Sequence, residues 1–212
     1  MTDKMVFMFD DPRPEKTLKD MKLTYGGKGA GLAQMTQMGL PVPYGFTIPC
    51  KLSTSAQQGW PAGLKEQVNE SIAKLEKRSG RKFGDATNPL LVSVRSGAPD
   101  SMPGMMDTVL NLGLNAKIAE AMAKKNPRFA WDSWRRFIMS FSDIVMGTGR
   151  EPYDNLMDAM KAKRGAKKDL DLNADDLKEL SAQFLAKYKE LVKKDFPQDP
   201  FEQLYAAINA VF

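Results

Sequence analysis

The sequence changes character near Asn115, and this change constrains the fold more than any other feature. Before it, short apolar runs alternate with glycine and proline, whereas after it apolar residues recur at three- and four-residue steps. Short runs bounded by turn residues indicate strands, and the longer spacing indicates amphipathic helices. We therefore expect an α+β lobe over residues 1–114 and an all-helical subdomain over residues 115–195.

The first lobe is expected to combine a small sheet with helices. Its strands are expected at 6–9, 41–49, 89–94 and, unless that stretch is an irregular turn, 108–115. The continuous apolar run of the third of these is consistent with a sheet buried on both faces. A glycine-rich loop is expected to lead into a helix that ends at Gly39, and the stripe Leu64–Leu75 predicts a helix that ends at Gly80.

The helical subdomain is expected to pack through apolar helix faces. The strongest face is formed by Trp134, Phe137, Ile138 and Phe141. Asn173 is a plausible N-cap of a second apolar helix, and the polar stretch 161–176 between them is expected to be an exposed connection. Residues 196–212 are expected to form a last helix, from Asp199 or Pro200, that ends on apolar sequence as a chain interrupted inside a domain would.

The chain has no histidine and a single cysteine, Cys50. These totals exclude Ser-His-Asp and Cys-His catalysis, histidine metal sites and an internal disulfide. A metal acting here would be oxygen-liganded Mg²⁺, held largely by the phosphates of a substrate. Chemistry that passes through a phosphohistidine would have to take that histidine from elsewhere.

The rest of the composition is ordinary for a soluble protein, with 42% hydrophobic and 27% charged residues. The net charge of +5 is spread along the chain, which favours a solvated basic surface over a dedicated anionic ligand. No stretch approaches the roughly 20 apolar residues of a membrane span. The first residues lack the shape of a signal peptide, so we expect a cytoplasmic protein.

The stretch "GGKGAGL" at 26–32 is a candidate phosphate-binding loop. Glycines at a helix entrance offer free backbone N–H groups and a positive helix end, and Lys28 adds a point charge. The stretch has neither the spacing of a Walker A loop nor that of a dinucleotide-binding turn. A tight turn with a solvated lysine is the alternative interpretation.

The stretch "SVRSGAPDSMPGMMDT" at 93–108 places Arg95 at the end of an apolar strand. Open α/β sheets bind ligands at such strand ends, and a guanidinium grips phosphate through two donors at once. The loop that follows is rich in small residues and could close over a ligand as a lid. Equally, this could be a surface loop whose arginine pairs with Asp100 or Asp107.

The stretch "WDSWRRF" at 131–137 interleaves aromatic and basic residues, as nucleic-acid-binding surfaces do. The helical spacing of its aromatic residues favours a core face instead. Asp132 and Arg136 form an i,i+4 pair, and at least one of Arg135 and Arg136 could still face a cleft. The carboxylates in the chain show no convincing spacing for a general acid/base pair.

Three segments resemble the amino-terminal nucleotide-binding domain of the pyruvate, phosphate dikinase family. They are "GGKGAGLAQMTQMGLPVPYGFTI", "NPLLVSVRSGAPDSMPGMMDTVLNLGLN" and "NPRFAWDSWRRFIMSFSDIVMG", and the resemblance extends over 6–212. The "SMPGMMDT" stretch favours the dikinase over its relative phosphoenolpyruvate synthase. The resemblance implies the first lobe of an ATP-grasp type fold, a helical insertion at 115–195, and a helix at 196–212 that returns to the first lobe.

The resemblance also implies an activity. ATP phosphorylates a histidine on a mobile domain and also inorganic phosphate, leaving AMP and pyrophosphate, and the phosphohistidine then makes phosphoenolpyruvate from pyruvate on a third domain. The expected partners are ATP, the remaining nucleotide-binding lobe, the phosphohistidine domain and the pyruvate-binding domain. The carboxylates that bind Mg²⁺ in the family are expected outside this chain, so the chain is expected to be inactive alone.

Transferred position by position, the resemblance gives roles to individual residues. Lys28 would bind the phosphates of ATP, Arg95 would hold them during transfer as the catalytic residue, and Arg136 would add another cation. The loop 101–108 would close over the nucleotide. Its nucleotide-binding residues would be Gly104, Met105, Met106, Asp107 and Thr108.

Other interpretations of the chain remain open. The lobe could be a stand-alone module that binds a phosphorylated ligand or a partner chain without catalysis, and the apolar tail at 206–212 would suit either reading. The chain could also be part of the related enzyme phosphoenolpyruvate synthase. Binding to nucleic acid has the weakest support, and no membrane partner is expected.

Overall fold

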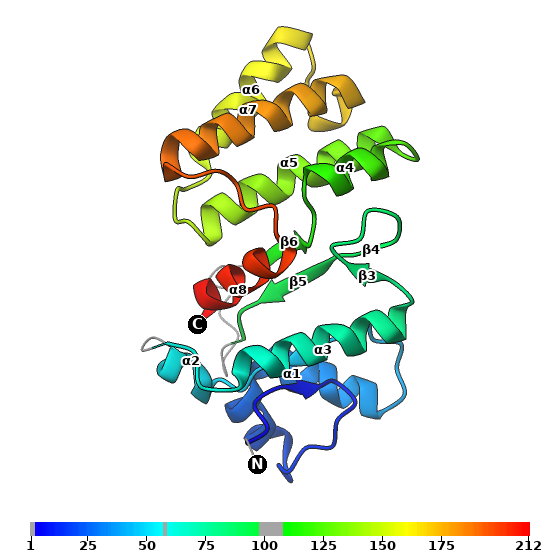
Figure 1. Ribbon diagram of the computed structural model, residues 1–212, viewed down its shortest axis with the longest axis vertical. Helices are drawn as coiled ribbons and strands as arrows, with labels where there is room; N and C mark the ends of the chain where they lie inside the picture. The colour runs from blue at the N-terminus through cyan, green and yellow to red at the C-terminus, as the bar shows by residue number, and fades with distance from the viewer. Residues whose placement is uncertain (1–2, 57–58, 98–107) are drawn as a thin grey trace. The chain divides into compact units, whose positions relative to one another are not determined.

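The computed structural model describes residues 3–56, 59–97 and 108–212, without the side chains of 54–56 (Figure 1). The chain divides into two compact units. Unit 1 comprises Met1–Arg81, Arg95–Asp107 and Phe212, and unit 2 comprises Lys82–Val94 and Thr108–Val211. The expected mixture of helices with small sheets, an α+β fold, is confirmed. The division at residues 114 and 195 stays a prediction.

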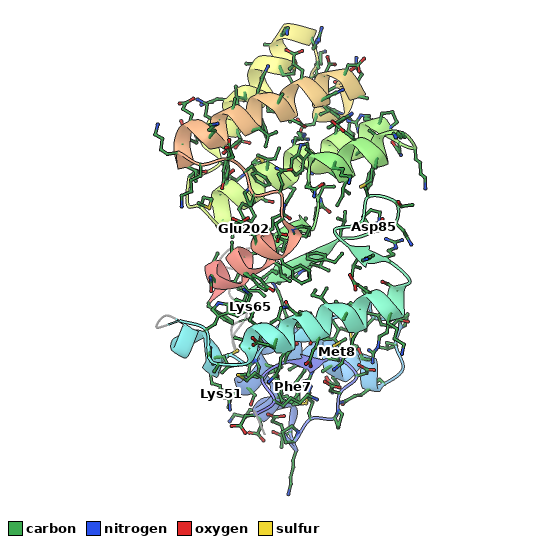
Figure 2. All side chains as sticks on the ribbon, in the orientation of Figure 1. Phe7, Met8, Lys51, Lys65, Asp85 and Glu202 are labelled. Carbon is green, nitrogen blue, oxygen red and sulfur yellow. The ribbon has the colours of Figure 1, made fainter. Side chains whose placement is uncertain are left out.

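Unit 1 joins a two-stranded ribbon to helices. β1 (Phe7–Met8) pairs antiparallel with β2 (Phe46–Thr47), so the strands expected at 6–9 and 41–49 are present but short. The short length of β2 follows from the prolines that flank it, because proline cannot donate a ladder hydrogen bond. Figure 2 labels Phe7 and Met8 on β1.

The helices of unit 1 are α1 (Leu18–Gln37), α2 (Lys51–Ala56) and α3 (Leu64–Ser79). α3 ends as expected, because Gly80 adopts the left-handed conformation with φ 65°. The end of α1 before Gly39 is also confirmed. The glycine-rich stretch leads into a helical segment as expected, but that segment is the second part of α1. The helix starts earlier, where the Thr17 hydroxyl accepts from the Asp20 N–H, and it breaks at Gly26.

The break in α1 divides it into two helical segments. Gly26 has φ 74° and ψ 163°, a backbone conformation that is essentially restricted to glycine. The chain resumes the helix at Gly27, so Lys28 lies in the first turn of the second segment. The core beside the break contains Met21, Tyr25, Ala30 and Ala33, with the ring of Phe7 5.2 Å from that of Tyr25.

Unit 2 begins with four short strands in two pairs. β3 (Lys82–Phe83) pairs parallel with β4 (Pro89–Leu90), and β5 (Val92–Arg95) pairs with β6 (Thr108–Leu112). The strand expected at 108–115 is thus confirmed. Arg95, the last residue of β5, is assigned to unit 1.

The expectation of one buried strand at 89–94 is wrong. The run is divided at Leu91 into β4 and β5, and along β5 Ser93 and Arg95 are exposed while Val92 and Val94 are half-buried. Within the described residues β5 belongs to a two-stranded sheet, and its alternation is that of a strand with one covered face. The apolar run therefore reflects two short strands in succession.

The rest of unit 2 is helical, as expected. Its helices are α4 (Ala116–Ala123), α5 (Pro127–Ile144), α6 (Glu151–Arg164), the 3₁₀ turn η1 (Asp169–Asp171), α7 (Ala174–Val192) and α8 (Pro200–Val211). In Figure 1, α5 and α7 run side by side with α6 packed beside α7. The Asn173 side chain accepts from the Asp175 and Asp176 N–H groups, which confirms it as the N-cap of α7.

Aromatic side chains fill the core of unit 2. Trp134, Phe137 and Phe141 of α5 are all buried, as the helical spacing predicts. The ring of Phe196, on the segment between α7 and α8, lies 5.2–5.5 Å from these three rings, and 5.0 Å from the ring of Tyr188. Edge-to-face packing of this kind adds to the gain from burying the rings themselves.

The stretch 161–176 is less exposed than expected. Leu170 is exposed, but Leu172 and Asp176 are buried. Arg128 accounts for part of this difference, because its guanidinium donates to the backbone carbonyls of Asp169 and Leu172 and ties the connection to α5. These partners are more than 40 residues apart in sequence, so no local pattern predicts them.

Candidate functional site

The break in α1 places the glycine turn directly against the segment that follows β5. A Cβ atom on Gly26 would lie 2.7 Å from the carbonyl carbon of Gly97, a separation that real Cβ atoms do not reach. Gly29 is also constrained, because a Cβ there would lie 2.8 Å from Cγ2 of Thr47 on β2. The two glycines thus allow the turn to approach both neighbouring segments closely.

Cys50 connects the same two segments. Its backbone N–H donates to the Thr24 carbonyl at 2.8 Å, and its thiol donates to the Gly97 carbonyl at 3.2 Å. Burial raises the pKa of the Cys50 thiol, which keeps it protonated and able to donate. Cys50 therefore holds the residue just before the turn through its backbone and the segment just after Arg95 through its thiol.

Lys28 and Arg95 are the cations of this junction. Lys28 is half-buried and Arg95 is exposed. Within the described ranges, neither side chain makes an ion pair or a hydrogen bond with another residue. No described residue therefore neutralises either charge. The alternative partners considered for Arg95, Asp100 and Asp107, lie outside the described residues.

The proposed lid is mostly outside the described part of the chain. Gly104, Met105, Met106 and Asp107 lie in the range 98–107, which is not described. Thr108 is described, and it is half-buried at the start of β6. The lid role of 101–108 therefore stays a prediction.

Arg135 and Arg136 are neighbours on α5 but differ in exposure. The Arg135 side chain is only 3% exposed, and it pairs with Asp132 at 2.6 Å and with Asp169 at 3.3 Å. Burial lowers the pKa of Arg135, while Asp132 opposes that shift. Arg136 is 57% exposed, and its Nε–H donates to Asp132 at 3.0 Å, which confirms the expected i,i+4 pair. Arg136 is thus the arginine that can meet a ligand.

The sequence-based site residues are distributed over both units. Lys28 and Arg95 belong to unit 1, where Gly26 and Gly97 touch. Arg136 and Thr108 belong to unit 2. Sequence reasoning missed Cys50 and Asp169 as supporting residues. Their partners are 47 and 34 residues away in sequence, so local spacing carries no signal for them.

The described residues do not form a magnesium cage. In residues 3–56, 59–97 and 108–212, no three histidine, cysteine, aspartate or glutamate side chains gather as a metal site would require. We therefore derive no catalytic step of this chain through a metal ion. The same ranges contain no helix of the length and apolar character needed to cross a membrane.

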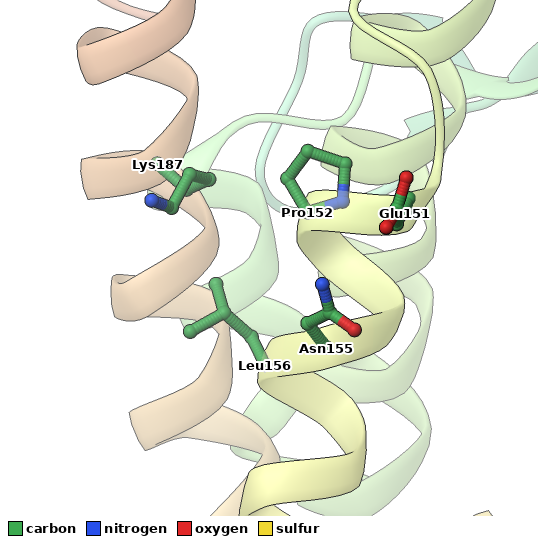
Figure 3. Close-up of a pocket in the computed structure, with 5 residues that line it drawn as sticks. All are labelled: Glu151, Pro152, Asn155, Leu156 and Lys187. Atoms are coloured by element: carbon green, nitrogen blue, oxygen red, sulfur yellow. The ribbon is translucent and has the colours of Figure 1, made fainter.

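A pocket of about 390 Å³ lies between α6 and α7 (Figure 3). It is lined by Glu151, Pro152, Asn155, Leu156 and Lys187. The ammonium of Lys187 is paired with Glu190 at 2.7 Å, and none of the sequence-based site residues lines this pocket. The pocket is therefore separate from the residues considered for phosphate binding.

Comparison with known proteins adds the family. A model of the pyruvate phosphate dikinase AMP/ATP-binding domain matches residues 53–134. The chain is also 47% identical over 215 residues to the pyruvate, phosphate dikinase of Clostridium symbiosum, which covers 99% of this chain and 24% of that protein. This chain belongs to the pyruvate phosphate dikinase family. The resemblance seen in the three sequence segments is thereby confirmed.

Other dikinases match in the same way. The Entamoeba histolytica enzyme is 50% identical over 196 residues, covering 90% of this chain and 22% of that protein. The chloroplastic pyruvate, phosphate dikinase 1 of Arabidopsis thaliana is 46% identical over 216 residues, covering 100% of this chain and 22% of that protein. The chain thus spans about a quarter of the length of the dikinases it matches.

Proposed function

We propose that this chain is the N-terminal part of a pyruvate, phosphate dikinase and supplies one part of its ATP site. The reaction would convert ATP, phosphate and pyruvate to AMP, pyrophosphate and phosphoenolpyruvate. This chain would help to bind ATP during phosphoryl transfer from ATP to a histidine of another domain and to inorganic phosphate. The similarity to several dikinases supports the assignment.

The observation that carries this proposal is the pair of cations, Lys28 and Arg95, on the two segments that meet at Gly26 and Gly97, neither of which pairs with another residue that the structure describes. Lys28 stands in the first turn of a helical segment, where the helix end and its N–H groups favour an anion. Arg95 stands at the end of β5 and offers a guanidinium that suits two phosphate oxygens. Two positive groups whose backbones are held together fit the phosphate chain of a nucleotide.

Phosphoryl transfer asks a protein mainly to position phosphates and to stabilise developing charge. We assign Lys28 to ATP binding and Arg95 to holding the phosphates during transfer, as the catalytic residue. Arg136 adds a further cation. The residues Gly104–Thr108 are proposed to close over the nucleotide.

The remaining parts of the reaction are assigned to other parts of the enzyme. The second nucleotide-binding lobe would complete an ATP-grasp fold and supply the carboxylates for Mg²⁺. The phosphohistidine domain and the pyruvate-binding domain would complete the catalytic cycle. We propose that the chain is inactive alone and that the enzyme works in the cytoplasm, without nucleic-acid or membrane partners.

ATP titration by isothermal calorimetry, with and without Mg²⁺, tests the proposal. Lys28→Ala and Arg95→Ala should each weaken ATP binding about tenfold or more, because each removes charge-assisted hydrogen bonds to phosphate. Lys22→Ala and Arg81→Ala are matched controls, since both remove an exposed cation of unit 1. If the parent chain binds no ATP, or if the controls weaken binding as much as the site variants, the proposal fails.

The same titration separates the alternatives. A stand-alone phospholigand module would bind inorganic phosphate or a phosphorylated peptide as well as ATP. If the chain is part of a dikinase, we expect ATP to bind more tightly than inorganic phosphate or a phosphorylated peptide. The relatives described above are dikinases, so neither this module nor phosphoenolpyruvate synthase is favoured.

A further inference from the structure

Asp132 binds two neighbouring arginines through different oxygens. Its Oδ1 accepts from Nε of Arg135 at 2.9 Å, and its Oδ2 accepts from Nε of Arg136 at 3.0 Å. The Asp132 side chain is 20% exposed, so the carboxylate lies at the boundary between the buried and the exposed guanidinium. It therefore touches both the core of unit 2 and the surface cation.

The contact with Arg136 occupies only one edge of the guanidinium. Nε is taken by Asp132, and within the described part of the chain the two terminal nitrogens of Arg136 have no hydrogen-bond or ion-pair partner. Terminal nitrogens are donors well suited to bidentate phosphate recognition. The pair thus fixes the direction of Arg136 while leaving these donors open.

The contact with Arg135 fixes Asp132 in turn. The buried Arg135 side chain also pairs with Asp169, whose other oxygen lies 3.5 Å from Nζ of Lys161. Asp132 and Asp169 therefore both pair with the buried guanidinium of Arg135. A chain of ion pairs leads from η1 through the helix core to the exposed arginine.

We propose that Asp132 is a positioning residue that presents Arg136 to the phosphates of the nucleotide. The inference rests on the proposed function, because it takes Arg136 as a phosphate-binding cation. A free arginine side chain must lose rotamer freedom when it binds, and a side chain already held by Asp132 loses less. Asp132 itself does not touch the ligand.

The proposal predicts that removing the Asp132 carboxylate changes the affinity for ATP in the direction opposite to that expected from net charge. Removing a carboxylate makes the surface more positive, so electrostatics alone predicts tighter binding of ATP. Positioning predicts the opposite, because Arg136 would become mobile. We expect Asp132→Ala to weaken ATP binding about threefold to tenfold.

Asp132→Asn is a second variant that disturbs the core less. The amide oxygen would face Arg135, whose two nitrogens approach Oδ1, and the amide NH₂ would then face Nε–H of Arg136. Two donors repel each other, so this variant should release Arg136 while keeping a contact to Arg135. It should weaken ATP binding in the same direction as the alanine variant.

Asp169→Asn is the matched control. It removes a charged partner of the same buried Arg135 but leaves the contact between Asp132 and Arg136 in place. A purely structural role of the network would make Asp169→Asn and Asp132→Asn equivalent. We expect Asp169→Asn to keep the parent affinity for ATP, at equal or lower thermal stability.

The experiment measures ATP affinity by calorimetry and follows the arginine Nε–H signals by ¹⁵N NMR in the 212-residue chain. The parent and Asp169→Asn should show a protected Arg136 Nε–H, which both Asp132 variants should lose. Arg136→Ala should weaken ATP binding about tenfold, and adding Asp132→Ala to it should have no further effect. If Arg136→Ala weakens binding but the Asp132 variants do not, the positioning role is wrong and the proposed function stands.

Other outcomes separate the two proposals further. If Arg136→Ala has no effect while Lys28→Ala and Arg95→Ala weaken binding, ATP binding is supported and the role of Asp132 is overturned. If neither those two variants nor Arg136→Ala changes the affinity, both proposals fail. Tighter ATP binding by Asp132→Ala would show that the carboxylate competes with the ligand, which also overturns the inference.

Discussion

Unit 1 and unit 2 hold their candidate phosphate-binding cations by different means. Lys28 and Arg95 have no ion-pair partner in the described ranges, and they are positioned through the backbone contact of Gly26 with Gly97. Arg136 is positioned through its side chain, by Asp132 on the previous turn of α5. Positioning a cation through its backbone requires no partner for its charge, but the close backbone contact leaves no room for an added atom. Positioning a cation by an ion pair leaves room for neighbouring atoms, but the partner neutralises part of the charge.

The same contrast extends to how each region is stabilised. The junction in unit 1 depends on the absence of side chains at glycines, while the helices of unit 2 depend on large side chains in close contact. The first kind of structure should fail when an atom is added, and the second when atoms are removed. Four experiments compare the two units, and the first two test this difference directly.

The largest expected effect is in the aromatic core. Phe137→Ala should lower the free energy of unfolding by about 3–5 kcal/mol, because it leaves a cavity among Trp134, Phe141 and Phe196. Phe129→Ala, on the same helix but 57% exposed, should cost less than about 1 kcal/mol. Urea denaturation measures both values. Equal losses would mean that α5 is not held by the buried face.

Adding one methyl group to the glycine turn should have the next largest effect. Gly26→Ala should lower the free energy of unfolding by about 2–3 kcal/mol, because it combines a backbone conformation unsuited to alanine with a clash against Gly97. Gly97→Ala meets only ordinary contacts at 3.6 Å and beyond, and Gly31→Ala meets no atom within 4 Å. The latter should even stabilise α1, by about 0.5–1 kcal/mol. A neutral Gly26→Ala would contradict the backbone contact.

Alkaline pH should destabilise unit 2 through the buried phenol of Tyr188. Burial in unit 2 raises the pKa of Tyr188 to about 12, above its value in the unfolded chain. The contribution of Tyr188 to stability is therefore complete below about pH 10 and is lost as the pH rises through 12, a loss on the order of 2 kcal/mol. Tyr188→Phe should remove this part of the decline, as seen in denaturation curves between pH 9 and 12. Tyr44→Phe, at an exposed position of unit 1, should leave the decline unchanged.

The smallest expected effect concerns the thiol that joins the two segments of unit 1. Cys50→Ala should lower the free energy of unfolding by about 0.5–1 kcal/mol, because the Gly97 carbonyl loses a hydrogen-bond donor. Cys50→Ser keeps a donor in nearly the same place and should recover most of that loss. A serine variant as unstable as the alanine variant would show that the thiol acts by packing rather than by donating.

Local patterns predicted the helices of this chain well. Gly80 ends α3 and Asn173 caps α7, because both signals act within one helical turn. The same reasoning failed for residues 89–94, where composition does not reveal that two short strands follow each other. It placed the start of a helical segment correctly at the glycine-rich stretch, but it missed the earlier segment of α1 that Thr17 caps.

The candidate site was predicted only in part, for a similar reason. The residue types of Lys28 and Arg95 are visible in sequence, and the family resemblance gives them roles. The contact between Gly26 and Gly97 joins residues 71 positions apart, and Asp169 reaches Arg135 over 34 positions. Sequence spacing paired Arg136 with Asp132, and the resemblance gave Arg136 the phosphate role. Only the structure shows that Arg135 is buried and paired with Asp169.

Gln203 has a consequence for the order in which the chain can fold during synthesis. Its buried side chain accepts from the Gly113 N–H at 3.0 Å and donates to the Leu114 and Pro197 carbonyls at 2.9 and 2.8 Å. Before residue 203 leaves the ribosome, the junction of β6 with α4 lacks these partners. The junction of β6 with α4 can therefore complete these hydrogen bonds only after Gln203 has been translated, and a nascent chain stopped shortly before Gln203 should remain sensitive to proteases at Gly113.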